Sequence, residues 1–404
     1  MKRLDGKKIG LVFPNPIAHE VRLLKTARVL VDAGAQVTVI VDAPQNVEMT
    51  ELDGFCEVIR LPLIQRLPIE PSRFGRLGAY VRSRRQARID RNLCEGIADE
   101  IMQRDFDIVH FVNYIFAPEI LRIKESSDIK VVYETYEDTP RVLEYVTKSG
   151  AMTPELRDHW IAEERKAVAI ADSVVVVSEE IKGRYACLTD AEKIFVVFNA
   201  APEMPILPTE VAHPLRFYCQ TGIRPYYGIE ELIKAFKGVS ADEAILAIQG
   251  PWVSDAYRDT LHDLIIKSGV EDRVELIEPC DMKDVVVEAN QYDVGLFAAP
   301  TMVNGQYLGN TDWSAPNRLF AYTSAGLALL FGHYQGIEAF AGKDTPFIRW
   351  MDQSDVSDIA EHIRFLVAHP DEVTQMKQAA FEWAEDWSVE KAEIAIRKAF
   401  TFSA

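Results

Sequence analysis

Short apolar runs alternate with stretches of helical periodicity along the first half of the chain. The apolar runs are rich in β-branched residues and have the length of strands, whereas the stretches between them repeat their apolar positions every three or four residues. Because parallel strands need crossovers, this alternation predicts an α/β, Rossmann-like domain with helices on both faces of a parallel sheet. The expected strands are KIGLVFP, QVTVIVD, CEVIRLP, DIVHFV, KVVYET, SVVVVS and KIFVVFN, and the first helix is expected from about His19 to Ala33.

A proline-rich stretch separates this pattern from a second alternation of the same kind. Its prolines suit neither a helix nor a central strand, so the stretch predicts an interdomain linker. Ligands of such sheets bind at the carboxyl ends of the strands, which makes the cleft between two such domains the expected site. The expected boundaries are 1–200 for the N-terminal domain, 201–215 for the linker, 216–385 for the C-terminal domain and 386–404 for a final helix.

Length and composition agree with two globular domains. The 404 residues exceed what one hydrophobic core usually organises. No apolar run has the length of a membrane span or of a signal peptide, so we expect a cytoplasmic protein. The five cysteines are scattered without metal-binding spacing, which predicts neither disulfides nor a bound metal. The net charge of -18 disfavours nucleic acid as a partner.

One segment departs from this acidic composition. Between Arg66 and Arg91 lie eight arginines and only two acidic residues. A basic amphipathic helix can lie on an anionic lipid surface, so we expect peripheral contact with the inner face of the cell membrane through Arg82, Arg84 and Arg85. A solvated helix face, or a surface that binds an anionic carrier or sugar, is the alternative.

Motifs of several enzyme classes are absent. The chain contains no G-x-G-x-x-G after the first strand, no phosphate-binding P-loop and no G-x-S-x-G. Instead, EVRLLKTARVLVDAGAQVTVIV, FDIVHFV, ADSVVVVSEEIKGRY, TGIRPYYGIEELIKAF and APNRLFAYTSAG together resemble the family-4-type glycosyltransferases of the GT-B fold along essentially the whole chain. The resemblance implies two Rossmann-like domains that face each other across a cleft, with the C-terminal helix packing back toward the N-terminal domain.

The resemblance places the nucleotide-sugar donor in the C-terminal domain, where a helix N-terminus and nearby cations hold a diphosphate. The family's lysine and arginine near the glycine turn are Tyr227 and Gly222 here, and the ribose-binding glutamate is Ala321. Arg224 is the expected substitute cation, and Asp312 could replace part of the missing acid. Pro316 and Gly326 suit the two ends of the helix between them. The expected donor-binding residues are Gly222, Arg224, Tyr227, Gly228, Asn317 and Arg318.

The resemblance assigns acceptor binding to the N-terminal domain. Its first helix carries Arg22 and Lys25 as the expected acceptor-binding residues. The stretch YETYE has Tyr136 where the family has a histidine beside the donor sugar, followed by Glu137. Together with His110, these two are the expected catalytic residues, although a histidine that ends a buried strand also suits a structural role.

The combined prediction is a retaining, metal-independent glycosyltransferase. It would move a sugar from a nucleotide-diphosphate sugar, as co-substrate, to the hydroxyl of a glycan or lipid-linked acceptor in polysaccharide or glycoconjugate assembly, with no other cofactor. Transfer would then rest on positioning and charge rather than on an enzymic nucleophile. Two alternatives stay open: a catalytically impaired GT-B-like binding or partner protein, and an epimerase or hydrolase of sugar nucleotides.

Overall fold

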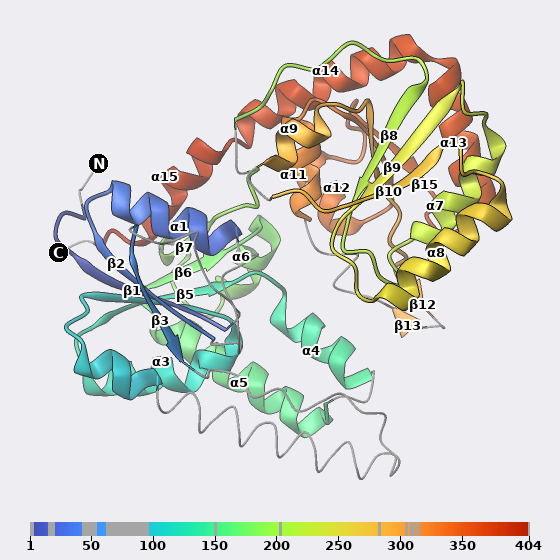
Figure 1. Cartoon of the computed structure of the whole chain (residues 1–404). Helices are drawn as coiled ribbons and strands as arrows, with labels where there is room; N and C mark the ends of the chain where they lie inside the picture. The colour runs from blue at the N-terminus through green and yellow to red at the C-terminus, as the bar shows by residue number, and fades with distance from the viewer. Residues whose placement is uncertain are drawn as a thin grey trace. The chain divides into compact units, whose positions relative to one another are not determined.

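The computed structural model divides the chain into two compact units. Unit 1 is Met1–Phe198 with Ala392–Ala404, and unit 2 is Asn199–Lys391 (Figure 1). The structure describes residues 4–14, 21–42, 55–61, 97–148, 152–201, 204–281, 284–303, 306–307, 312 and 316–402. The expected arginine-rich helix, with Arg82, Arg84 and Arg85, lies outside these residues.

Unit 1 is built on a parallel sheet. In the described residues it has seven strands in the order β3-β2-β1-β4-β5-β6-β7. The strands that the pattern predicted all form, and the nearly continuous burial of the three central strands, β1, β4 and β5, is what a sheet covered on both faces requires. The strands are β1 (Lys8–Phe13), β2 (Gln36–Asp42), β3 (Glu57–Leu61), β4 (Ile108–Val112), β5 (Lys130–Thr135), β6 (Ser173–Val176) and β7 (Ile194–Val196).

Helices cover both faces of this sheet. One face packs against α1, and the other against α3, α5 and α6 (Figure 1). The end of the chain joins the α1 face, because Ile396 and Phe400 are buried in the same core as β1 and β2. The expected return of the C-terminal helix to the N-terminal domain is thus confirmed. The helices are α1 (Val21–Asp32), α3 (Ala117–Ser126), α4 (Thr139–Lys148), α5 (Pro154–Ile170), α6 (Glu179–Tyr185) and α15 (Val389–Ala399).

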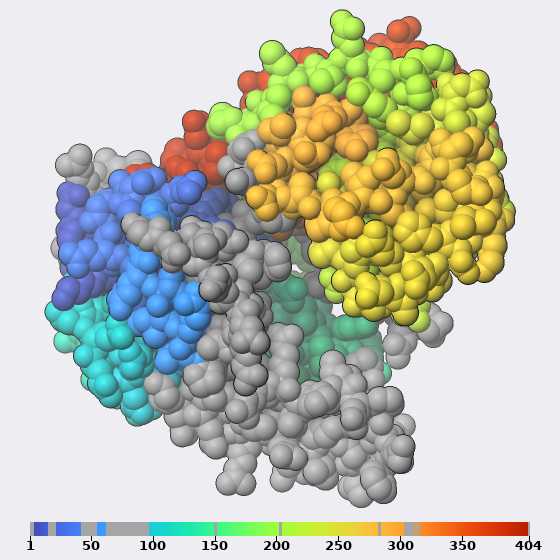
Figure 2. All heavy atoms as spheres, in the orientation of Figure 1, coloured from blue at the N-terminus to red at the C-terminus, as the bar shows by residue number. Residues whose placement is uncertain are grey.

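Unit 2 repeats the architecture with a second parallel sheet. Its described strands form a six-stranded sheet in the order β10-β9-β8-β11-β14-β15. Segments from the beginning, the middle and the end of the unit lie next to one another on its surface (Figure 2). The strands are β8 (Leu215–Gln220), β9 (Ala244–Gln249), β10 (Val274–Ile277), β11 (Val294–Phe297), β14 (Ala328–Gly332) and β15 (Ile348–Met351), and β12 (Met302–Val303) pairs with β13 (Gln306–Tyr307) outside the sheet.

The helices of unit 2 also form two groups. α7, α8 and α13 contact one another or the core beneath them, while α11 packs against α9 and α14. This arrangement of two parallel α/β sheets confirms the predicted fold class. The helices are α7 (Ile229–Ala235), α8 (Asp255–Ser268), α9 (Val285–Ala289), α11 (Asn317–Ser324), α12 (Gln335–Ala341), α13 (Val356–Ala368) and α14 (Pro370–Asp386).

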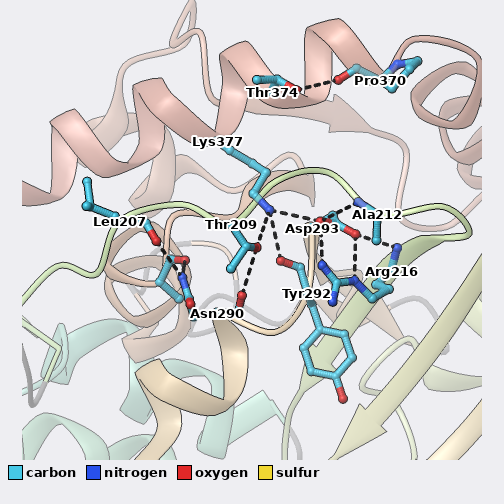
Figure 3. Close-up of polar contacts among 11 residues, drawn as sticks. Leu207, Thr209, Ala212, Arg216, Asn290, Tyr292, Asp293, Pro370, Thr374 and Lys377 are labelled. Atoms are coloured by element: carbon cyan, nitrogen blue, oxygen red, sulfur yellow. Dashed lines mark hydrogen bonds and ion pairs between the residues drawn. The ribbon is translucent and has the colours of Figure 1, made fainter.

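The proline-rich segment is bound to unit 2 over most of its described length. Lys377 on α14 donates hydrogen bonds to the Thr209 hydroxyl at 3.1 Å and to the Asp293 carboxylate at 3.0 Å (Figure 3). Asp293 is fully buried and also accepts from Arg216 and from the backbone N–H of Ala212. Burial lowers the pKa of Lys377, and the Asp293 charge opposes that shift. A segment without regular secondary structure is therefore held by a buried ionic cluster.

Candidate functional site

Arg318 connects three elements at the carboxyl edge of the unit 2 sheet. It lies in the first turn of α11, and its Nη2 donates to the Thr221 hydroxyl, just after β8, at 3.3 Å. Its guanidinium carbon lies 4.0 Å from the centre of the Phe297 ring, at the end of β11. Because β8 and β11 are neighbours in the sheet, both contacts are made at one place.

The second terminal nitrogen of Arg318 is buried and has no hydrogen-bond partner in the described part of the chain. A buried donor of a charged group without a partner is costly, and an anion is the partner that would satisfy both the hydrogen bond and the charge. The N-terminus of α11 adds its own unpaired N–H groups and partial positive charge. Asn317, the first residue of this helix, is exposed. The first turn of α11 therefore has the chemistry of an anion site.

The loop between β8 and α7 brings a second cation to this edge. A Cβ atom on Gly222 would lie 2.9 Å from Nη2 of Arg224, so the Arg224 guanidinium lies over this glycine. The same guanidinium carbon is 4.7 Å from the centre of the Tyr227 ring. Arg224 is exposed and Tyr227 is half-buried. The Arg224 guanidinium thus lies beside Gly222, the position where the family has an arginine side chain.

Gly228 is fixed by its surroundings. Its φ of 77° lies in the left-handed region, and a Cβ atom there would lie 2.0 Å from the carbonyl oxygen of Ala298. The loop therefore approaches the segment after β11 as closely as only glycine permits, and α7 begins at the next residue.

Ala321 takes the place of the acid that the resemblance puts on α11, and Asp312 is the residue expected to replace part of that acid. Ala321 is buried. Both carboxylate oxygens of Asp312 accept hydrogen bonds from Gln335, one from its backbone N–H at 3.0 Å and one from its side-chain amide at 2.8 Å. Asp312 is therefore engaged at the start of α12.

In unit 1, one of the expected acceptor residues contacts one of the expected catalytic residues. The guanidinium carbon of Arg22, at the start of α1, lies 3.8 Å from the centre of the Tyr136 ring, just after β5. Lys25 follows one turn later on α1, and its Nζ donates to the carbonyl oxygen of Phe198 at 3.5 Å. These contacts lie at the carboxyl edge of the sheet, where ligands of such folds bind.

His110 is enclosed in the interior of unit 1. Its Nε2 lies 2.7 Å from a carboxylate oxygen of Glu134 on the neighbouring strand, and both side chains are buried. Its ring packs against Phe400 with centroids 5.5 Å apart. The His110 side chain is therefore buried against Glu134 and is not exposed to solvent. Glu134 was not expected from the sequence, although its place in YETYE was the available signal.

Glu137 is exposed, and its backbone is held by the Thr135 hydroxyl, which donates to its carbonyl oxygen at 2.8 Å. Behind this turn lies the buried carboxylate of Glu164. Its Oε1 accepts hydrogen bonds from three hydroxyl groups, while burial raises the pKa of its carboxyl against their opposing effect. These donors are Tyr133 at 2.6 Å, Thr139 at 2.6 Å and Tyr185 at 2.9 Å.

The fold has counterparts among known proteins. Residues 19–202 match the model of Glycosyltransferase Family 4. Sucrose-phosphate synthase from Thermosynechococcus elongatus superposes with a TM-score of 0.66 at 14% identity, over 96% of each chain. The chain has the GT-B fold. Anabaena HepE in complex with UDP gives a TM-score of 0.65 at 13% identity, over 97% of this chain and 98% of HepE.

The lipopolysaccharide outer core galactosyltransferase WaaB is a further structural neighbour of this chain. Its TM-score is 0.55 at 12% identity, over 95% of this chain and 98% of WaaB. No curated protein matches the chain significantly in sequence. Among the described residues, no helix is both long and apolar enough to cross a bilayer.

Proposed function

We propose that this protein is a glycosyltransferase that takes its sugar from a nucleotide-diphosphate donor bound by unit 2. The buried, unpartnered nitrogen of Arg318 is the observation that carries this proposal, since a diphosphate oxygen would complete it. Arg224 over Gly222 supplies a second positive charge at the same sheet edge. The solved structures of HepE with UDP and with UDP-glucose support a nucleotide sugar as the donor class.

We propose further that the transfer retains the configuration of the sugar and needs no metal ion. Arg318, Arg224 and the N-terminus of α11 would stabilise the charge that develops on the leaving diphosphate, which is the task a metal would otherwise perform. The diphosphate would assist removal of the proton from the acceptor hydroxyl. Tyr136 and Glu137 would position that hydroxyl, and His110 would act through Glu134. Polysaccharide or glycoconjugate assembly is the proposed setting.

A binding protein without transferase activity is the second candidate. Ala321 favours it, since the expected ribose-binding acid is absent and Asp312 is engaged with Gln335. A transferase, a hydrolase of sugar nucleotides and a binding protein differ in when they release free nucleotide. A transferase releases free nucleotide only when an acceptor is added, a hydrolase releases it without acceptor, and a binding protein releases none.

Calorimetric titration with UDP, GDP and ADP tests the donor site. We expect heat with at least one nucleotide. Arg318→Ala should weaken the affinity at least about tenfold, because it removes charge-assisted hydrogen bonds worth about 1.5–3 kcal/mol. Lys267→Ala is the matched control, since Lys267 is exposed on α8 and pairs with Asp263. The absence of heat with all three nucleotides would refute the donor proposal, and an unchanged affinity of Arg318→Ala would remove Arg318 from the site.

A further inference from the structure

Arg22 and Lys25 bring two positive charges to one place in unit 1. They lie three residues apart on α1, so their side chains leave the same face of the helix. The first turn of α1 contains no acidic residue. Both side chains are half-buried at the carboxyl edge of the sheet.

The Arg22 guanidinium is only partly satisfied by its surroundings. Stacking on the Tyr136 ring at 3.8 Å gives it a cation–π contact. Its Nη1, however, is buried and has no hydrogen-bond partner among the residues that the structure describes. A guanidinium presents its N–H groups as a planar fork that fits the oxygens of a carboxylate or phosphate. The open donor of Arg22 is thus suited to an oxyanion.

Lys25 lies in the same electrostatic environment. Burial lowers the pKa of its ammonium group to about 8, and the nearby charge of Arg22 acts in the same direction. The acidic groups that oppose this shift are Glu134 on β5 and Glu393 on α15. Glu134 is itself in contact with His110. The hydrogen bond from Lys25 to the Phe198 carbonyl is long, at 3.5 Å, so the ammonium group also has capacity for an added anion.

We propose that Arg22 and Lys25 bind an anionic group, a phosphate or a carboxylate, of the acceptor molecule. The proposal rests on the proposed function, because it concerns the acceptor of the same transfer. Tyr136 links the two assignments, since its ring holds Arg22 while Glu137 follows it on the exposed turn. An acceptor anchored by its anionic group would present a neighbouring hydroxyl to this turn. A bound anion would also offset the repulsion between the two cations.

Titration of the whole chain with small anions tests the proposal without nucleotide. Inorganic phosphate and glucuronate are the two probes, and glucose is the neutral control. We expect heat from at least one anion and none from glucose. The tighter of the two anions identifies the acceptor group as phosphate or carboxylate. Arg22→Gln and Lys25→Met should each weaken the binding at least about tenfold, equivalent to about 1.4 kcal/mol.

Three further variants distinguish binding at this site from binding at the donor site and from a general effect of positive charge. Arg28→Gln, on the exposed face of the same helix, should bind as the unmodified chain does. Arg318→Gln should retain the part of the anion signal that depends on Arg22, because Arg318 belongs to the donor site of unit 2. Arg22→Lys keeps the charge without the fork, and its binding should fall between those of arginine and glutamine if it folds with an unchanged melting temperature.

Two results would overturn the proposal. The first is the absence of heat with both anions, and the second is an anion signal that Arg22→Gln leaves intact but Arg318→Gln abolishes. Nucleotide binding by unit 2 is measured separately, so a failure here leaves the donor assignment standing. Conversely, an anion signal that depends on Arg22 in a chain that binds no nucleotide would contradict the proposed function alone.

Discussion

Replacing Asp293 by asparagine should destabilise unit 2 more than replacing its partner Lys377 by methionine. Asp293 is fully buried and the Lys377 side chain is 2% exposed. In Asp293→Asn, the side-chain amide oxygen can still accept from the Lys377 ammonium, as the Thr209 hydroxyl and the Tyr292 carbonyl oxygen do at 3.1 and 3.3 Å, but the negative charge of Asp293 is lost. Breaking a buried ion pair in this way leaves an uncompensated charge and costs about 3–5 kcal/mol.

The reverse replacement leaves a better satisfied charge. In Lys377→Met, the Asp293 carboxylate still accepts from Arg216 through the backbone N–H, Nε and Nη2, at 3.0, 3.1 and 3.2 Å. We therefore expect a cost of about 1–3 kcal/mol, the value of a lost hydrogen bond to a charged group. The double variant should cost less than the sum of the two by about 0.5–3 kcal/mol, since each replacement removes the same contact.

Urea unfolding followed by tryptophan fluorescence measures these differences. Trp160 is the tryptophan of unit 1, so the signal reports mainly on unit 2, whose tryptophans are Trp252, Trp313, Trp350, Trp383 and Trp387. Lys267→Met, which removes an exposed ion pair on α8, should change the free energy of unfolding by less than about 0.5 kcal/mol. The reasoning is refuted if Lys377→Met costs as much as Asp293→Asn, or if the two effects add without coupling.

Three other replacements have expected outcomes. Gly228→Ala should lower the free energy of unfolding by about 1–3 kcal/mol, because the added Cβ meets the Ala298 carbonyl oxygen. It should also lower the nucleotide affinity measured by calorimetry. An unchanged affinity would show that the loop is not part of the donor site. Burial raises the pKa of Glu164 in the folded state above its unfolded value, so the stability that the protonated group contributes is present at low pH and is lost as the pH rises through the folded-state pKa. Urea unfolding at several pH values should show this loss for the unmodified chain but not for Glu164→Gln. Parallel pH profiles of the two proteins would contradict the raised pKa. Replacing Arg82, Arg84 and Arg85 by serine should reduce the fraction of protein that co-sediments with anionic liposomes. An unchanged fraction would exclude a role of these arginines in membrane contact.

The sequence predicted the local structure of both units well. The alternation of apolar runs and helical periodicity predicted the strands of both sheets, because strand and helix patterns depend on residues two to four positions apart. The two ends of α11 were also predicted from local sequence. Pro316 precedes the helix, and Gly326 follows it with a φ of 66°. The resemblance to family-4-type glycosyltransferases added the expected class of enzyme and the expected site residues.

The partners of the site residues could not be read from the sequence. Glu134 as the partner of His110, Tyr136 as the stacking surface of Arg22, and the position of Arg224 over Gly222 each depend on side-chain direction. The proline-rich segment shows the same limit. Its composition predicted a linker, but its attachment to unit 2 depends on Asp293 and Lys377, which lie 84 residues apart in the sequence.

The sequence by itself determined the α/β architecture and placed Arg318 at the start of a helix. Tertiary structure decided what Arg318 contacts, because Thr221 lies 97 residues away and meets it only once β8 and β11 pair in one sheet. Helix and strand patterns are properties of neighbouring residues, so the chain carries them without folding. A buried donor without a partner is a property of the folded surroundings, since burial and hydrogen-bond geometry exist only after distant segments have packed together.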